Sequence, residues 1–152
     1  MSTISNQPLD PVAKLEEMLK HEAVEQDMEE QLSSVQNIPE ALANLCLGRA
    51  LGGHHSPTLV QRCFELGAKT PSSDGISRFC QSIGRHPQSA TKMQDCLDVM
   101  HKQGWDFNQN IDGSSLLHHL IDNIRDSVGH QWVEQYIAKA EKYGLNLTKR
   151  QL

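Results

Sequence analysis

Eight histidines and four cysteines are the side chains of this 152-residue chain best suited to bind a metal ion or act as a base or nucleophile. Two histidine pairs stand out, His54-His55 in "LGGHHSP" and His118-His119 in "GSSLLHHL". The second pair lies in a predicted helix, where adjacent side chains diverge by about 100° and cannot readily share one ion. The first pair lies in a glycine-rich loop, but zinc needs three or four protein ligands and none is close in sequence. We therefore predict no metal and no cofactor.

The cysteines could supply the thiol of a Cys–His catalytic pair, in which a base activates the nucleophile. They are 16 or 17 residues apart, without a C-x-x-C pair, at Cys46, Cys63, Cys80 and Cys96. Each lies in a predicted helix beside apolar neighbours, and buried thiols have raised pKa values and react poorly. We predict buried, reduced cysteines and no enzymatic activity. A His/Cys metal-dependent or hydrolytic enzyme is the alternative, and it requires several of these side chains to converge in a pocket.

Charge is unevenly distributed along the chain. The formal net charge is −5; residues 1–40 hold two basic and nine acidic side chains, giving −7, and the remaining residues give +2. No cluster of Lys and Arg marks a nucleic-acid surface, so we predict no nucleic-acid partner. No run approaches the roughly 20 apolar residues that span a bilayer, which predicts no membrane insertion. The first residues lack the apolar segment of a secretory signal, and we expect a cytoplasmic protein.

Helices must position these residues. Residues 1–8 are polar and are predicted to be a disordered tail. Residues 9–36 are predicted to form one acidic helix, with Asp10 as its N-cap and Pro11 at its first position. We expect this helix to cap the apolar end of the following helices, although it could instead be an arm that binds a partner. After Asn37 nothing alternates with period two, so no strands beyond small hairpins are expected.

The helices of residues 37–152 form pairs that repeat. The second helix of each pair ends at a glycine, and these glycines are 37 and 40 residues apart, at Gly67, Gly104 and Gly144. Glycine supplies the left-handed conformation common at a helix C-terminus. The turn pair Asp74-Gly75 recurs 38 residues later as Asp112-Gly113. Self-similarity at this period is typical of stacked helix-pair repeats.

The residues at these turns resemble ankyrin repeats. "GWDFN" (104–108) and "GLNLT" (144–148) are similar to the Gly-Ala-Asp-Val-Asn segment that ends an ankyrin repeat. "DGSSLLHHL" (112–120) is similar to the Asp-Gly-x-Thr-Pro-Leu-His-x-Ala opening, whereas "DGISRFCQS" (74–82) has a cysteine in place of the histidine. The resemblance implies an all-α fold: a short solenoid of about three ankyrin-like helix-turn-helix repeats, approximately residues 37–73, 74–111 and 112–152, with an additional N-terminal helix.

Two single residues take their expected roles from this resemblance. His118 falls where ankyrin repeats carry a histidine that bonds across the turn, which implies a structural role. Trp105 stands where those repeats usually have alanine. We expect it to pack between turns; the alternative is an exposed binding anchor, since tryptophan is enriched in interface hot spots.

The resemblance also implies that the chain binds another protein. Ankyrin-type repeats meet partners at the tips between helices and on the concave face of the inner helices. Carried over by position, the expected contact residues are Ser73, Ile76, Arg85, Gln109, Asn110, Ser114, Asp122 and Asn123. An adaptor, an inhibitor or a bacterial effector delivered to the host-cell cytosol would fit this description. A structural homodimer or larger homo-oligomer, joined through the last repeat or the N-terminal helix, is the other alternative.

Overall fold

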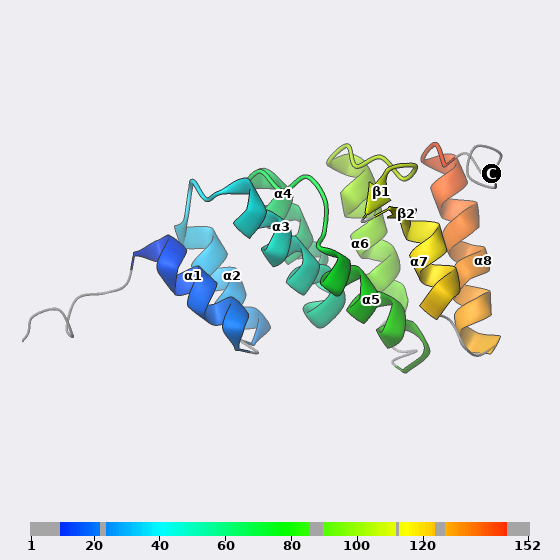
Figure 1. The fold of residues 1–152 in the computed structure, drawn as a ribbon, viewed down its shortest axis with the longest axis horizontal. Helices are drawn as coiled ribbons and strands as arrows, with labels where there is room; N and C mark the ends of the chain where they lie inside the picture. The colour runs from blue at the N-terminus through cyan, green and yellow to red at the C-terminus, as the bar shows by residue number, and fades with distance from the viewer. Residues whose placement is uncertain (1–9, 22–23, 86–89, 112, 124–126, 146–152) are drawn as a thin grey trace, which may run out of the picture.

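Four helical hairpins stand side by side in a row (Figure 1). The computed structural model describes residues 10–21, 24–85, 90–111, 113–123 and 127–145, and the predicted tail of residues 1–8 lies outside them. Within the described residues the elements are α1 (Pro11–Lys20), α2 (Glu25–Ser34), α3 (Glu40–Arg49), the π-helical turn η2 (Ala50–His54), α4 (Pro57–Glu65), α5 (Ser73–Arg85), α6 (Ala90–Lys102), β1 (Asn110–Ile111), β2 (Ser114–Ser115), α7 (Leu116–Asn123) and α8 (Ser127–Lys142). The chain is mostly helical, so the all-α class is confirmed.

The hairpins are packed in two layers. The first helices, α1, α3, α5 and α7, contact one another in succession, and α2, α4 and α6 do the same behind them. The last helix, α8, lies against α5 and α7. One continuous apolar core runs along the row, from Leu15 in α1 to Tyr136 in α8. Each hairpin therefore buries its apolar surface on its neighbours, which is how stacked helical units are stabilised. No helix in the described residues is both long and apolar enough to cross a bilayer.

Three second helices end in the same way, as the glycine spacing predicts. Gly67, Gly104 and Gly144 have φ angles of 106°, 87° and 102°. In each case the N–H of the residue after the glycine donates to the carbonyl five residues back: Ala68 to Cys63 at 3.0 Å, Trp105 to Met100 at 3.0 Å, and Leu145 to Ala140 at 2.9 Å. These are Schellman motifs, and the buried residue after each glycine adds the usual apolar contact.

The N-terminal segment differs from its prediction. Residues 9–36 form two helices, α1 and α2, and not one. On a continuous helix Leu15 and Met28 would point about 140° apart, so one face could not bury both. The hairpin lets both side chains enter the core, where each is fully buried. The backbone is extended at His21 and at Val24, on either side of the break.

Helices α3 and α5 meet through glycines. An added Cβ on Gly75 would lie 2.3 Å from the Cα of Gly48, and one on Gly52 would lie 2.3 Å from the carbonyl oxygen of Gly75. The prediction of a turn at Asp74-Gly75 is therefore wrong: both residues lie in the first turn of α5. Gly75 is needed there because its missing side chain allows the two backbones to touch.

A two-stranded hairpin precedes α7. Asn110 pairs with Ser115 and Ile111 with Ser114, and Gly113 has a φ of 86°; Asp112 lies outside the described residues. In the part of the chain that the structure describes, the strands are these two short ones, in line with the expectation of no strands beyond small hairpins. The turn predicted at Asp112-Gly113 is thus confirmed at Gly113, whereas Asp74-Gly75, which was expected to be equivalent, lies in a helix.

Candidate functional site

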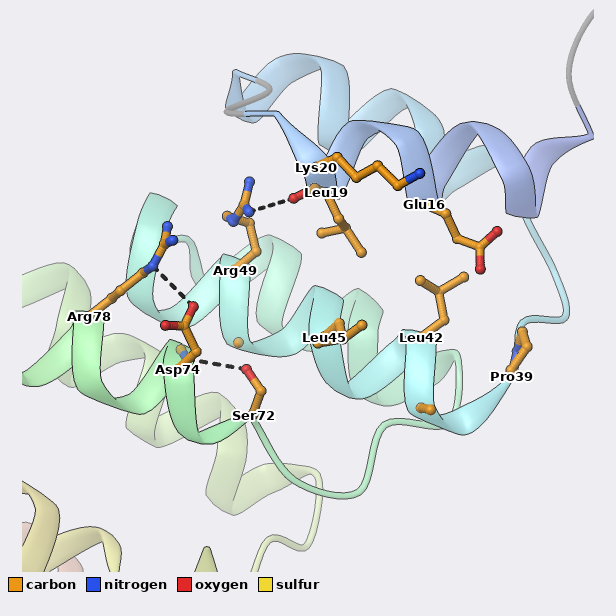
Figure 2. Close-up of a pocket in the computed structure, with 13 residues that line it drawn as sticks. Glu16, Leu19, Lys20, Pro39, Leu42, Leu45, Arg49, Ser72, Asp74 and Arg78 are labelled. Atoms are coloured by element: carbon orange, nitrogen blue, oxygen red, sulfur yellow. Dashed lines mark hydrogen bonds and ion pairs between the residues drawn. The ribbon is translucent and has the colours of Figure 1, made fainter. Parts of the chain in front are cut away.

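A groove of about 590 Å³ lies on the exposed side of the first helical layer, between α1, α3 and α5 (Figure 2). Its apolar lining comes from Leu19, Ala41, Leu42, Leu45, Gly48 and Gly75. Its polar lining comes from Glu16, Lys20, Arg49, Ser72, Asp74 and Arg78. The volume is within the range of ligand-binding clefts. The groove is partly open to solvent, so side chains of a polypeptide could enter it from outside.

Leu45 is the most unusual residue of the groove. Helix α3 is apolar on several faces: Leu42, Cys46 and Leu47 are buried in the core, whereas 51% of Leu45 is exposed. A half-exposed leucine beside other apolar lining residues makes a contiguous apolar surface, and such surfaces often mark interaction sites. The glycine contact between α3 and α5 forms the bare floor next to it, since Gly48 and Gly75 present no side chains.

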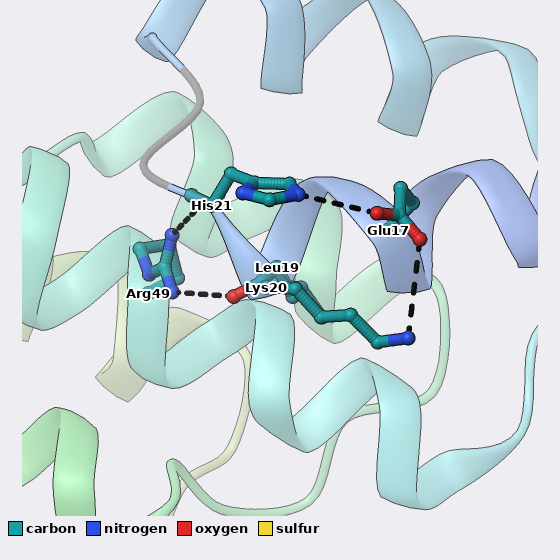
Figure 3. Close-up of polar contacts among 5 residues, drawn as sticks. All are labelled: Glu17, Leu19, Lys20, His21 and Arg49. Atoms are coloured by element: carbon teal, nitrogen blue, oxygen red, sulfur yellow. Dashed lines mark hydrogen bonds and ion pairs between the residues drawn. The ribbon is translucent and has the colours of Figure 1, made fainter.

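Arg49 forms one end of the groove, and its hydrogen bonds connect α3 to α1 (Figure 3). Its guanidinium donates to the carbonyl oxygens of Leu19 at 2.8 Å and His21 at 3.0 Å. These carbonyls lie at the C-terminus of α1, where the helix dipole favours a positive charge. Glu17 accepts from His21 at 3.2 Å and is 3.9 Å from the ammonium of Lys20. Arg49 thus fixes the α1 wall relative to α3.

The α5 wall carries an ion pair. Arg78 Nε is 3.2 Å from Asp74 Oδ2, one turn away on the same helix, and both side chains are largely exposed. Ser72 caps this helix, since its hydroxyl accepts from the N–H of Gly75 at 3.2 Å (Figure 2). The rim is therefore charged on α1, α3 and α5, around an apolar centre.

Of the eight contact residues expected from the resemblance, the six whose side chains the structure describes do not line this groove. Ile76 is a correction: it is fully buried in the core, because it belongs to the face of α5 that packs inward. Ser73 is partly exposed, and Gln109, Asn110 and Ser114 lie at or beside the β-hairpin with partly or fully exposed side chains. Asp122 is exposed on α7, and the side chains of Arg85 and Asn123 lie outside the described part of the structure.

One feature of the sequence indicates the exposed apolar surface of α3, although it was not among the predicted sites. The segment "LANLCLGRAL" is apolar on more positions than one buried helical face requires, which places an apolar residue such as Leu45 at the surface. The α1 wall of the groove could not be predicted from such a pattern. Residues of α1 reach α3 only because the N-terminal segment folds back as a hairpin.

The four cysteines lie in the core and not at the surface. All four thiols are free and buried. Burial raises the pKa of Cys46, Cys80 and Cys96 to about 12, and raises that of Cys63 well above its ordinary value. A thiol with such a pKa is almost entirely protonated at neutral pH. Over the same residues, no three His, Cys, Asp or Glu side chains are grouped as metal ligands.

The histidine pairs have structural contacts. His118 Nδ1 lies 3.3 Å from the hydroxyl of Ser115, which also accepts from the backbone N–H of His118 at 3.2 Å and so caps α7. His119 Nε2 lies 2.8 Å from the carbonyl oxygen of Ile111. His55, with a φ of 52°, ends η2 and its Nδ1 lies 3.0 Å from the carbonyl oxygen of Leu51. Burial lowers the pKa of His54, against the opposing effect of Glu25.

Trp105 packs, as expected: it is 5% exposed and meets Phe107 edge to face at 4.9 Å between ring centroids. Nearby, Asp98 of α6 accepts from Lys139 Nζ at 2.6 Å and from the hydroxyl of Tyr143. Burial alone would raise the pKa of Asp98, but these two hydrogen bonds lower it overall. The hydrogen bond to Asp98 raises the pKa of Tyr143 to about 12. His101 stacks on the Tyr143 ring at 3.9 Å.

Comparisons of the chain with models of protein families, with curated proteins and with solved structures find no match. The groove between α1, α3 and α5 is thus the candidate site on the strength of its geometry.

Proposed function

We propose that this protein is a non-enzymatic protein-binding module, an array of ankyrin-like helical hairpins that receives a segment of another protein in the groove between α1, α3 and α5. The observation that carries the proposal is the half-exposed Leu45, which lies at the centre of an apolar groove with charged walls. An apolar centre with a polar rim is the usual anatomy of a protein interface.

The ankyrin-like part of the proposal is supported by local geometry. Three hairpins end at a glycine with positive φ, and a serine–histidine contact joins the β-hairpin to α7. An adaptor, an inhibitor or a delivered effector that works in the cytosol would each use such a module. The fold alone does not identify which, because fold does not determine function.

A substitution pair tests the proposed binding surface. Leu45→Glu places a charge in the groove, and Ile121→Glu places one on α7 at a residue that is equally exposed, 52% against 51%. Purified wild-type protein is used to capture partners from a lysate, and each captured protein is then purified and its affinity for both variants is measured by calorimetry. We expect Leu45→Glu to abolish binding and Ile121→Glu to leave it unchanged, with both variants folded by circular dichroism. A partner that binds both variants equally would show that the groove is not the interface.

A further inference from the structure

The charges of the groove point to the chemistry of its partner. We propose that the groove binds an acidic amphipathic peptide segment, whose aliphatic side chains pack on Leu19, Leu42 and Leu45 and whose carboxylate side chain meets Arg49 and Arg78. This inference rests on the proposed function and specifies the class of ligand that the same groove accepts.

The groove carries positive charge although the chain as a whole is negative. Its lining includes three cationic side chains, Lys20, Arg49 and Arg78, and two anionic ones, Glu16 and Asp74. The formal charge of the lining is therefore +1, whereas that of the chain is −5. Oppositely charged surfaces speed encounter and select the partner. A partner that carries carboxylates would thus meet a lining whose net charge is opposite to its own.

The two arginines of the lining lie at the same end of the groove. Arg49 and Arg78 lie past Leu45, with Asp74 beside Arg78. Glu16 lies over Leu42 toward the other end, and the ammonium group of Lys20 extends to that same end (Figure 2). The three leucines lie between these ends. A peptide that follows this axis would place apolar side chains in the middle and a carboxylate at the arginine end. A basic residue at that end would meet two guanidinium groups.

The positive charge of Arg49 is not neutralised by a carboxylate in the described residues. Its hydrogen-bond acceptors are the backbone carbonyls of Leu19 and His21, which are neutral, and two of its five N–H donors suffice for them. Its remaining N–H groups can therefore donate to a carboxylate without breaking the α1 contact. Charge-assisted hydrogen bonds of this kind are the stronger ones in proteins.

Arg78 can change partners at little cost. Its ion pair with Asp74 lies within one helix, with 46% and 78% of the two side chains exposed. Exposed ion pairs of this type contribute little to stability. An incoming carboxylate would compete with Asp74 for the same guanidinium. Asp74 should therefore weaken binding of the peptide, whereas Arg78 should strengthen it.

Selection from a random dodecapeptide display library on full-length wild-type protein tests the ligand class. We expect enriched peptides to share aliphatic residues and at least one Asp or Glu, and to lose binding to Leu45→Glu but not to Ile121→Glu. Enriched peptides that need the groove but lack acidic residues would overturn this inference and leave the proposed function standing. No enrichment, or binding that is indifferent to Leu45, would count against both. A wild-type dimer that Leu45→Glu dissociates would assign the groove to a second copy of the chain instead.

Two neutralising substitutions give effects of opposite sign. For an enriched peptide, Arg78→Gln should weaken affinity about five- to tenfold, because a charge-assisted contact is lost. Asp74→Asn should tighten it, since a competing carboxylate is removed. Lys92→Gln, on the exposed face of α6, is the matched control and should change nothing. Weakening by both Arg78→Gln and Asp74→Asn would indicate that the ion pair only supports α5, and would contradict the proposal.

Discussion

At the scale of single residues, several of the histidines and cysteines that suggested chemistry are hydrogen-bonded to the fold or buried in its core. Ser115 and His118 fix the start of α7, and the four thiols fill the core. The burial of the cysteines was correctly predicted from the sequence, because their neighbours are apolar and a free cysteine behaves as a small apolar residue. The Asp98, Lys139 and Tyr143 cluster was not predicted, since Asp98 is more than 40 residues away from both of its partners and no local pattern pairs them.

This cluster predicts a pH-dependent contribution to stability. Asp98 has a lowered pKa in the folded chain, so its contribution is present above the unfolded pKa of about 3.9 and is lost as the pH falls through the folded value. Tyr143 has a raised pKa of about 12, so its contribution is present below the unfolded value and is lost as the pH rises through about 12. Asp98→Asn should therefore cost at most about 1 kcal/mol at pH 7. The cost should diminish in urea unfolding curves recorded below about pH 3.9.

Asp95→Asn is the matched control for this prediction, because Asp95 is exposed on the same helix. It should shift the unfolding midpoint very little at either pH. A cost of Asp98→Asn that stays the same in acid would mean that the charge of the carboxylate is not what holds α6 to α8.

At the scale of elements, the sequence predicted helix ends better than helix contacts. Glycine spacing located the Schellman motifs, because a positive φ is a local requirement that glycine meets alone at low cost. The single helix predicted over residues 9–36 was wrong because burial of both Leu15 and Met28 requires the chain to fold back between them, which the local helix signals do not indicate. The groove was missed for a related reason: it forms only where α1, α3 and α5 come together, and that juxtaposition is a property of the folded chain.

Replacement of a glycine that ends a helix should lower the free energy of unfolding through backbone strain alone. An added Cβ on Gly104 meets no atom within 4 Å, so Gly104→Ala introduces no clash. Its φ of 87° is nevertheless unfavourable for alanine, and we expect a loss of about 1–2 kcal/mol in the free energy of unfolding. Gly67→Ala should lose a similar amount, because its cap is equivalent. Gln103→Ala, at the exposed preceding residue, is the control in the same chemical denaturation. A negligible effect at both glycines would argue against the shared cap.

Substitution at the α3–α5 contact should act through packing instead. Gly75→Ala places a methyl group against the backbone of Gly48, which cannot move without displacing a helix. We expect a loss of about 1–3 kcal/mol, the usual cost of overpacking, together with a change in the groove floor. Gly53→Ala is the comparison, since the atoms nearest to its Cβ belong to the Arg49 side chain, with Cδ at 3.0 Å, and not to the backbone of a neighbouring helix. Equal stabilities of the two variants, measured by thermal unfolding, would contradict a tight glycine contact.

At the scale of the whole molecule, the N-terminal hairpin is attached to the row by two arginines from the next hairpin. Arg49 donates to carbonyls at the end of α1, and Arg62 donates to those of Leu32 at 2.8 Å and Val35 at 2.6 Å at the end of α2. Both contacts put a positive charge at a helix C-terminus, where the dipole favours it. They also explain how a strongly acidic segment is held by a part of the chain whose net charge is positive.

Because a stacked array gains stability from contacts between neighbours, removal of these contacts should loosen one end and not the rest. Arg49→Gln and Arg62→Gln should each cost about 1–2 kcal/mol of docking free energy, since each removes charge-assisted hydrogen bonds. Hydrogen exchange followed by mass spectrometry should then show faster exchange in α1 and α2, with α7 and α8 unchanged. Arg78→Gln, which breaks only an ion pair within α5, should leave the exchange of α1 and α2 as in the wild type. Faster exchange throughout the chain would instead mean that the four hairpins unfold as a single cooperative unit, and that the groove between α1 and α3 opens only when the whole protein does.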